Sequence, residues 1–315
     1  MPLSDSQLEP FDTVYRSVTA VMTGHAAGLN PPDRAWLEAL IVAFANERAV
    51  WNTDPSLIPY RREWKRLRSR VMWLVAGAYL HVGYDLPRAL ADHWPGRGPW
   101  RAGPDHDRGA QIFFVELAPV FPEQLAKAVG NRRIVGWLRF PSLIMTRGMA
   151  RAASIWVHSL RQGAWLHAGK LARSKRRPAL EAAMADAMQA ALADASDVYL
   201  WRIAALRSPE AAIWTSPVAA VGAAMAPSWA QSVIAGVASA LGVHLIWAYV
   251  RRHRREDERA TAFVELWGRL LTDYLSAAVS KPGDFHRRRN QRRALLGLPP
   301  LREDLEVRRD GERGD

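Results

Sequence analysis

The chain of 315 residues contains no cysteine. It therefore cannot form a disulfide bond, use a thiolate nucleophile, or bind zinc or an iron–sulfur cluster through cysteine. The sequence also lacks the glycine-rich phosphate loop, the dinucleotide-binding glycine pattern, the Gly-x-Ser-x-Gly turn and the His-Glu-x-x-His pair. These absences remove the usual support for an ATPase, a dinucleotide oxidoreductase, an α/β-hydrolase or a zinc protease of that type.

Lysine is scarce, because five of the 43 basic residues are lysines and 38 are arginines. The 31 acidic residues leave a formal net charge of +12. Arginine pairs with carboxylate or phosphate through two nitrogens at once. Two explanations of the excess stay open: an arginine-rich coding bias, since arginine is also spread over ordinary helix surfaces, and anionic partners, with anionic lipid or a membrane ahead of nucleic acid. The acidic start of the chain lacks the basic and apolar stretches of a secretory signal, so we expect a cytoplasmic protein, with attachment to the inner face of the membrane as an alternative.

The apolar residues recur at the helical period in nearly every long segment, and no two alternating strands are joined by a hairpin turn. We therefore predict an all-α fold, a multi-helix bundle. Asn30 is expected to cap a helix that runs to about Trp51, and a third helix is expected to start near Tyr60 and to end before Pro87. Two further helices are expected over about Ser142–Arg173 and Leu180–Leu206. The expected organisation is a helical domain over 1–207, an apolar helical segment over 208–250, an amphipathic helix within 251–283 and a flexible basic tail over 284–315.

The segment from Ala211 to Val250 contains no Asp, Glu, Lys or Arg. Its last twenty residues would form a helix of about 30 Å, which matches the hydrocarbon thickness of a bilayer. The basic run Arg251–Arg255 follows directly, as expected on the cytoplasmic side of a span. Two alternatives stay open here: a membrane span or hairpin, and a buried helix rich in small residues. A second basic run, His286–Arg293, is predicted either to contact RNA or anionic lipid or to be a solvated charge run.

One pair of polar residues lies on an otherwise apolar helix. His81 and Asp85 are four residues apart and therefore share a helical face with Leu74, Gly77 and Ala78. Burying a carboxylate without a partner would cost roughly several kcal/mol of stability, so Asp85 is expected to pair with a cation, a metal or a histidine. The small residues leave space beside the pair, which a neighbouring helix or a ligand would fill.

Three interpretations of this pair are open: a structural hydrogen bond, a metal-free acid–base or ligand-binding pair, and a metal site. In the metal interpretation His81 and Asp85 are ligands of a divalent cation, which would be the cofactor of the protein. Asp107 or Glu116 would then complete the site or act as the general base. The basic stretch from Arg61 to Arg70 would suit the approach of an anionic substrate.

Several short motifs, taken in order, resemble a bacterial family of helical proteins, DUF5995. They are Val42-Ala43-Phe44-Ala45-Asn46, Tyr79-Leu80-His81-Val82-Gly83-Tyr84-Asp85-Leu86, Asp105 to Arg108, and Arg161 with Ala164-Trp165. The resemblance covers about Phe11–Leu206, and the chain departs from the family pattern at Leu80, Glu47 and Arg48. It implies an all-α domain and draws attention to Asn46, His81 and Asp85, but it carries no known activity. The candidate residues for contacting the substrate or supporting the site are Asn46, Arg70, Arg161 and Trp165.

Two functional hypotheses follow from the sequence. The first is a divalent-metal-dependent hydrolase with a buried His81/Asp85 site, which acts on an anionic small molecule and is membrane-associated. The second is a non-enzymatic helical scaffold or binding protein, in which the pair is structural and the basic segments contact anionic lipid or nucleic acid.

Overall fold

The fold is taken from a computed structural model, which describes residues 2–67, 70–94, 104–117, 120, 123–124, 142–205, 258–299 and 301. Within these ranges the chain forms helices and no β-strand, which confirms the predicted all-α class. The elements that position the site are α1 (Asp5–Ala27), α2 (Pro31–Ala49), η1 (Pro55–Leu57), α3 (Ile58–Arg66), α4 (Arg70–Leu80), η2 (His81–Asp85) and α5 (Leu86–Asp92). The others are α6 (Pro104–Gln111), η3 (Ile112–Glu116), α9 (Ser142–Arg173), α10 (Arg177–Ala205), a helix over 258–280, η5 (Pro282–Asp284) and α12 (Phe285–Leu295).

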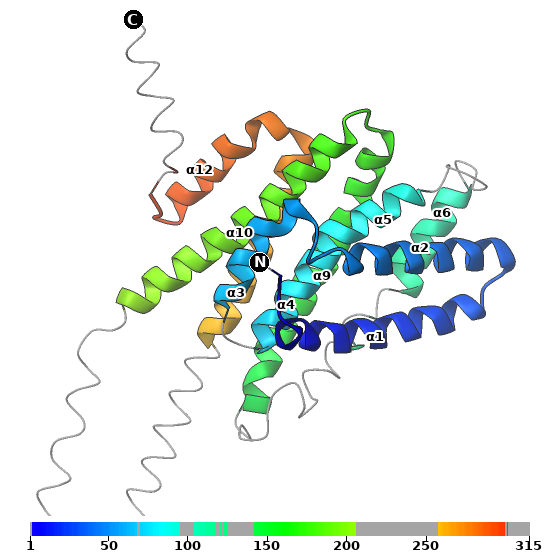
Figure 1. The fold of residues 1–315 in the computed structure, drawn as a ribbon, viewed down its shortest axis with the longest axis horizontal. Helices are drawn as coiled ribbons and strands as arrows, with labels where there is room; N and C mark the ends of the chain where they lie inside the picture. Colours follow the sequence, from blue (N-terminus) through cyan, green and yellow to red (C-terminus); the bar gives the residue numbers. More distant parts are fainter. Residues whose placement is uncertain are drawn as a thin grey trace, which may run out of the picture.

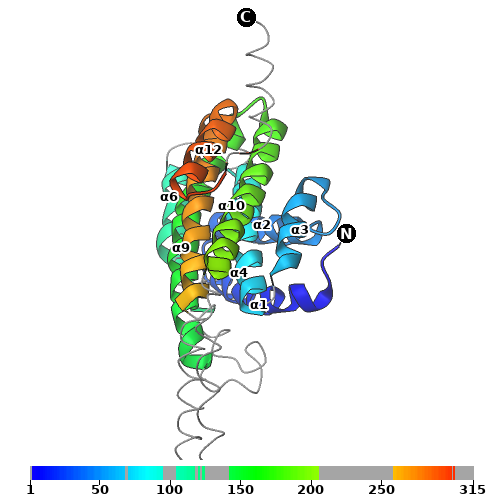
Figure 2. The same cartoon turned by 90° about the vertical axis from the view of Figure 1, so that its left-hand side faces the viewer.

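The continuous rod formed by α4, η2 and α5 runs through the middle of the bundle (Figure 1). It is covered by α1, which packs against α4, and by α9, which packs against α5 and η2. Figure 2 shows α9 and α10 beside each other. In this view α1, α2 and α3 lie to the right of these two helices, and α12 lies near their upper end. Since η2 is also in contact with α2 and α10, the predicted His81/Asp85 pair lies on an element whose five residues are all buried.

Local sequence signals fix some of the helix ends. The side chain of Asn30 accepts a hydrogen bond from the backbone N–H of Asp33 at 3.1 Å, which is the predicted cap of α2. The long helix α9 has the predicted bounds, and α10 begins three residues before the predicted start.

The rod differs from the prediction at Pro87, because α5 continues through this residue instead of ending before it. The cause is η2, a π-helical turn in which the backbone N–H of Leu86 bonds to the carbonyl of His81, five residues back. The wider turn accommodates the proline ring, which in a regular helix would collide with the carbonyl four residues earlier.

The C-terminal part differs from the prediction in a second way. Residues 285–295, expected to lie in a flexible tail, form α12. The predicted apolar segment over 208–250 lies outside the described residues. Among the helices of the described ranges, none combines the length and the apolar character that crossing a bilayer requires.

Candidate functional site

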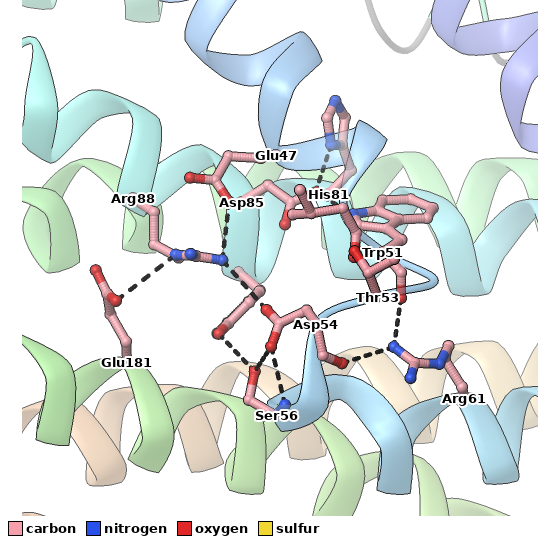
Figure 3. A network of polar contacts seen from close by, with 12 residues as sticks. Glu47, Trp51, Thr53, Asp54, Ser56, Arg61, His81, Asp85, Arg88 and Glu181 are labelled. Atoms are coloured by element: carbon pink, nitrogen blue, oxygen red, sulfur yellow. Dashed lines mark hydrogen bonds and ion pairs between the residues drawn. The ribbon is translucent and has the colours of Figure 1, made fainter. Parts of the chain in front are cut away.

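His81 and Asp85 face each other across the wide turn of η2, as their spacing predicts. His81 Nδ1 lies 2.8 Å from Asp85 Oδ2, and the indole Nε1 of Trp51 donates to the same oxygen at 2.6 Å (Figure 3). His81 is 3% exposed and Asp85 is fully buried. His81 Nε2 and Asp85 Oδ1 are also buried, and neither has a hydrogen-bond partner among the described residues. The pair therefore has one internal bond, one fixed donor and two unused polar atoms.

The imidazole of His81 is enclosed by four aromatic rings. Phe44 stacks on it with 3.4 Å between ring centroids, and Tyr15, Phe11 and Trp51 meet it edge-on at 4.9, 5.3 and 5.7 Å. These rings come from α1, from α2 and from the turn that follows α2. The enclosure removes water from the imidazole and fixes its plane.

The space that Gly77 leaves beside the pair is filled by a neighbouring helix. A Cβ atom at Gly77 would lie 2.5 Å from the ring of Phe11, which is a severe overlap. Phe11 is completely buried and belongs to α1, so glycine at this position is what allows α1 to pack against α4. Of the two predicted possibilities, a neighbouring helix or a ligand, the helix α1 is therefore the one that fills the space at Gly77.

Burial sets the protonation of the pair. It raises the pKa of Asp85 to about 8, against the smaller opposing effects of the Trp51 hydrogen bond and the Arg88 charge. Burial also lowers the pKa of His81 well below its usual value, and the nearby Arg48 charge acts in the same direction. Both shifts disfavour a net charge, so the pair as a unit stays neutral from well below pH 6.5 up to about pH 8.

The position of the protons follows from this neutrality. A neutral pair holds two protons: with one between Nδ1 and Oδ2, the other has two available atoms, His81 Nε2 and Asp85 Oδ1. When the pair loses one proton at alkaline pH, the hydrogen bond to Asp85 keeps the shared proton, so Nε2 becomes bare. In that state the pair presents Nε2 as a bare acceptor.

A charged network supports the turn from its other side (Figure 3). The guanidinium of Arg88 lies 2.8 Å from Glu47, 3.8 Å from Asp54 and 3.9 Å from Glu181. Burial raises the pKa of Glu47 to about 7, although Arg88 opposes the shift. The buried Arg61 donates to the backbone carbonyls of Trp51 and Asp54 and so holds the loop that carries the indole. The network ties α2, η1 and α10 to the segment that bears Asp85.

A small apolar cavity adjoins the aromatic enclosure. Its volume is about 60 Å³. The lining residues are Val18, Met22, Leu40, Phe44, Val82, Leu86, Phe113, Leu117, Val120 and Arg161. Phe44 both lines the cavity and covers the imidazole, so this one ring lies between the cavity and His81.

The two predicted acid–base residues lie elsewhere. Glu116, at the end of η3, is held by Arg108 and by His25, whose Nε2 is 2.8 Å away. Asp107 is exposed on α6. Within the ranges that the structure describes, no three His, Asp or Glu side chains gather in a way that could hold a metal ion. The structure therefore gives no support for Asp107 or Glu116 as the residue that completes a metal site with His81 and Asp85.

The remaining predicted residues also occupy separate places. Asn46 is exposed on α2, and Arg70 pairs with Glu9 near the surface. Arg161 is buried and donates to the carbonyls of Phe113 and Leu117, which places it at the wall of the cavity. Trp165 is buried against Trp94, Phe113 and Phe114. Of these residues only Arg161 borders a space next to the pair.

Sequence reasoning missed the roles of Trp51, Phe44 and Arg88. A signal was available for Arg88, which follows Asp85 by three residues and so shares its face. The indole of Trp51 reaches Asp85 from 34 residues earlier, and only the packing of α2 on the rod reveals that contact.

The fold and the site together define a helical-bundle protein with an enclosed, uncharged His–Asp pair. Residues 2–200 match the model of a family described as "Family of unknown function (DUF5995)". The chain belongs to this family, as its motifs indicate. No curated protein and no solved structure matches the chain.

Proposed function

We propose that the protein is an acid–base enzyme that needs no metal, in which His81 Nε2 gives and takes the proton. The observation that carries this proposal is the unpartnered, buried Nε2 of an imidazole whose other nitrogen is held by Asp85. A histidine oriented by a carboxylate is a recurrent arrangement for general acid–base catalysis. Asp85 orients the ring and sets its protonation, and Trp51 fixes the carboxyl oxygen.

The substrate enters from the apolar cavity when the ring of Phe44 moves. A volume of about 60 Å³ is close to that of two water molecules, since one water occupies about 30 Å³ in the liquid. The cavity therefore suits a short apolar group. The one charged residue in the lining of the cavity is Arg161, so a polar end of the substrate would lie there. Hydrolysis of a small ester or amide is the reaction class that we infer: His81 Nε2 removes a proton from water as the water attacks the carbonyl, and returns it to the leaving group.

A metal-dependent hydrolysis would use the same nitrogen as a ligand, with Asp85 holding the ring from behind. It would need two or more further ligands from outside the described residues. The metal-free reaction needs only groups that lie at the site.

The test is hydrolysis of p-nitrophenyl esters of increasing acyl length by the full chain. We expect saturable turnover that favours the shortest acyl groups and rises with pH up to about 8. His81→Gln should lower the turnover by about a hundredfold or more, the size of a general base's contribution. The control His158→Gln, which replaces an exposed histidine on α9, should leave it unchanged.

Nitrogen-15 NMR of the histidine rings tests the proton's position without any substrate. We expect His81 Nε2 to carry a proton at neutral pH and to be bare once the pair, in which burial raises the pKa of the Asp85 carboxyl to about 8, has lost one proton. An Nε2 that keeps one state throughout, or full esterase activity in His81→Gln, would refute the proposal.

A second candidate, a non-enzymatic helical binding protein, is favoured by the near-complete burial of the pair. Here the His–Asp bond only fixes η2 against α2. His81→Gln would then lower the free energy of unfolding and alter no reaction.

A further inference from the structure

The basic helix α12 is anchored by one buried carboxylate. Asp194 of α10 is fully buried and accepts hydrogen bonds from Tyr274 at 2.9 Å and from Arg289 at 2.8 and 3.0 Å. Arg293 binds the same carboxylate. Two of the five arginines in α12 therefore serve to hold the helix against α10 and the helix over 258–280.

The other three arginines of α12, at positions 287, 288 and 292, border a hollow of about 610 Å³ between this helix and the helix over 258–280. The remaining lining residues are Asp273, Tyr274, Ser276, Ala277, Gln291 and Leu295. This volume lies within the range of small-molecule sites, which is about 300–1,000 Å³. The hollow is thus large enough for a small organic ligand.

The charges around the hollow are unbalanced. Three arginines line it, and Asp273 is the one carboxylate residue in its lining. Arg292 pairs with Asp273, and Arg287 pairs with Asp284 at 3.2 Å while 70% of its side chain stays exposed. Arg288 has no ion pair with any residue that the structure describes. The hollow therefore presents a net positive charge with arginine nitrogens open to solvent.

We infer that this hollow binds a phosphate group, as a small organic phosphate or diphosphate. Arginine is suited to phosphate because its planar fork makes two parallel charge-assisted hydrogen bonds. Ser276 and Gln291 offer further donors, and Ala277 with the largely exposed Leu295 gives the hollow an apolar side for the organic part. This inference does not depend on the proposed acid–base reaction, because its residues lie on other elements.

The direct test measures binding of inorganic pyrophosphate to the full chain by calorimetry at physiological salt. We expect saturable binding at one site, which Arg288→Gln and Arg292→Gln each weaken by about tenfold, as expected for loss of a charge-assisted contact. The matched control is Arg62→Gln, which removes an exposed arginine of α3 and should not change the affinity. Circular dichroism checks that each variant keeps its helices.

A second pair of variants separates a specific hollow from general charge. Asp273→Asn and Asp186→Asn each remove one negative charge, but only Asp273 lines the hollow, whereas Asp186 is exposed on α10. We expect Asp273→Asn to tighten pyrophosphate binding several-fold and Asp186→Asn to leave it unchanged. Equal effects of the two variants would overturn the inference.

Vesicles distinguish the sources of the phosphate. Binding to phosphatidic acid vesicles but not to phosphatidylcholine vesicles, with competition by pyrophosphate, would assign the phosphate to a lipid headgroup. Pyrophosphate binding without vesicle binding would assign it to a soluble ligand. The inference is wrong if neither probe binds saturably, or if the chain binds only RNA and Arg62→Gln weakens that binding as much as Arg288→Gln.

Discussion

Replacing Asp85 with asparagine is expected to remove a fall in stability that the natural protein shows between about pH 6.5 and 8. Burial raises the pKa of Asp85 from 3.8 to about 8. The unfolded chain therefore releases this proton first, and the stability present below pH 3.8 is lost as the pH rises toward 8. For His81 burial lowers the pKa, so its contribution is present above pH 6.5 and is lost as the pH falls.

The magnitude follows from the two opposite slopes. Each proton difference changes the free energy of unfolding by about 1.4 kcal/mol per pH unit. Below pH 6.5 the slopes of Asp85 and His81 oppose each other, and above pH 6.5 only the slope of Asp85 remains. Between pH 6.5 and 8 the contribution of the pair to the free energy of unfolding therefore falls by about 2 kcal/mol. With its amide oxygen at the position of Oδ2, Asp85→Asn would still accept from Trp51 Nε1 and would accept from a protonated His81 Nδ1, so the variant keeps the shape of the site.

The assay is urea unfolding of the natural protein and of Asp85→Asn at several pH values in this window. Glu47, whose pKa is raised to about 7 mainly by burial, adds its own slope to both proteins, and the charge of Asp85 makes a smaller contribution to that shift. The control Asp186→Asn removes an exposed carboxylate. The reasoning is refuted if the stability of Asp85→Asn falls in parallel with that of the natural protein from pH 6.5 to 8.

Three further variants test the packing around the pair and the anchor of α12. Gly77→Ala should lower the free energy of unfolding by about 1–3 kcal/mol in urea unfolding, because the new methyl group overlaps the ring of Phe11. Trp51→Phe leaves the buried carboxyl of Asp85 without its N–H donor and should cost about 1–3 kcal/mol in the same assay. Asp194→Asn should free α12, because two arginines lose their common partner, and limited proteolysis should then cleave the chain near 285–295.

For each of these three predictions, one outcome would contradict the reasoning. Gly163→Ala is the control for Gly77→Ala, because the nearest atom to its new Cβ would be 3.5 Å away, so equal losses would show that overlap is not the cause. An unchanged stability of Trp51→Phe would mean that the indole donor is dispensable. Protection of residues 285–295 in Asp194→Asn would show that α12 is held by its apolar contacts alone.

The helices were predictable where the signals that define them are local. The bounds of α9 and the cap at Asn30 depend on neighbouring residues, and both predictions are confirmed. Pro87 misled the prediction because its accommodation depends on the wide turn of η2, and a π-helical turn has no simple local pattern. The basic run of α12 looked like a solvated tail because its partner, Asp194, is 99 residues away from Arg293 in the chain.

The same distinction applies to the site. The spacing of His81 and Asp85 predicted their contact, since both lie on one helix. The rings that enclose them come from α1 and from the region around the end of α2, and the sequence contains no record of which helices pack against the rod. The space at Gly77 was visible in the sequence, but Phe11, 66 positions earlier, could be assigned to it only from the packing.

The site combines two features that each cost stability. An ionisable pair is buried among aromatic rings with two polar atoms unpaired, and the helix that carries it has a π-helical turn at that point. Replacing such a pair with apolar side chains is often neutral or stabilising, so packing alone does not explain its presence. Unfavourable features that coincide in one place are typical of functional sites, where stability is given up for chemistry. This coincidence favours proton transfer at His81 over a purely structural bond.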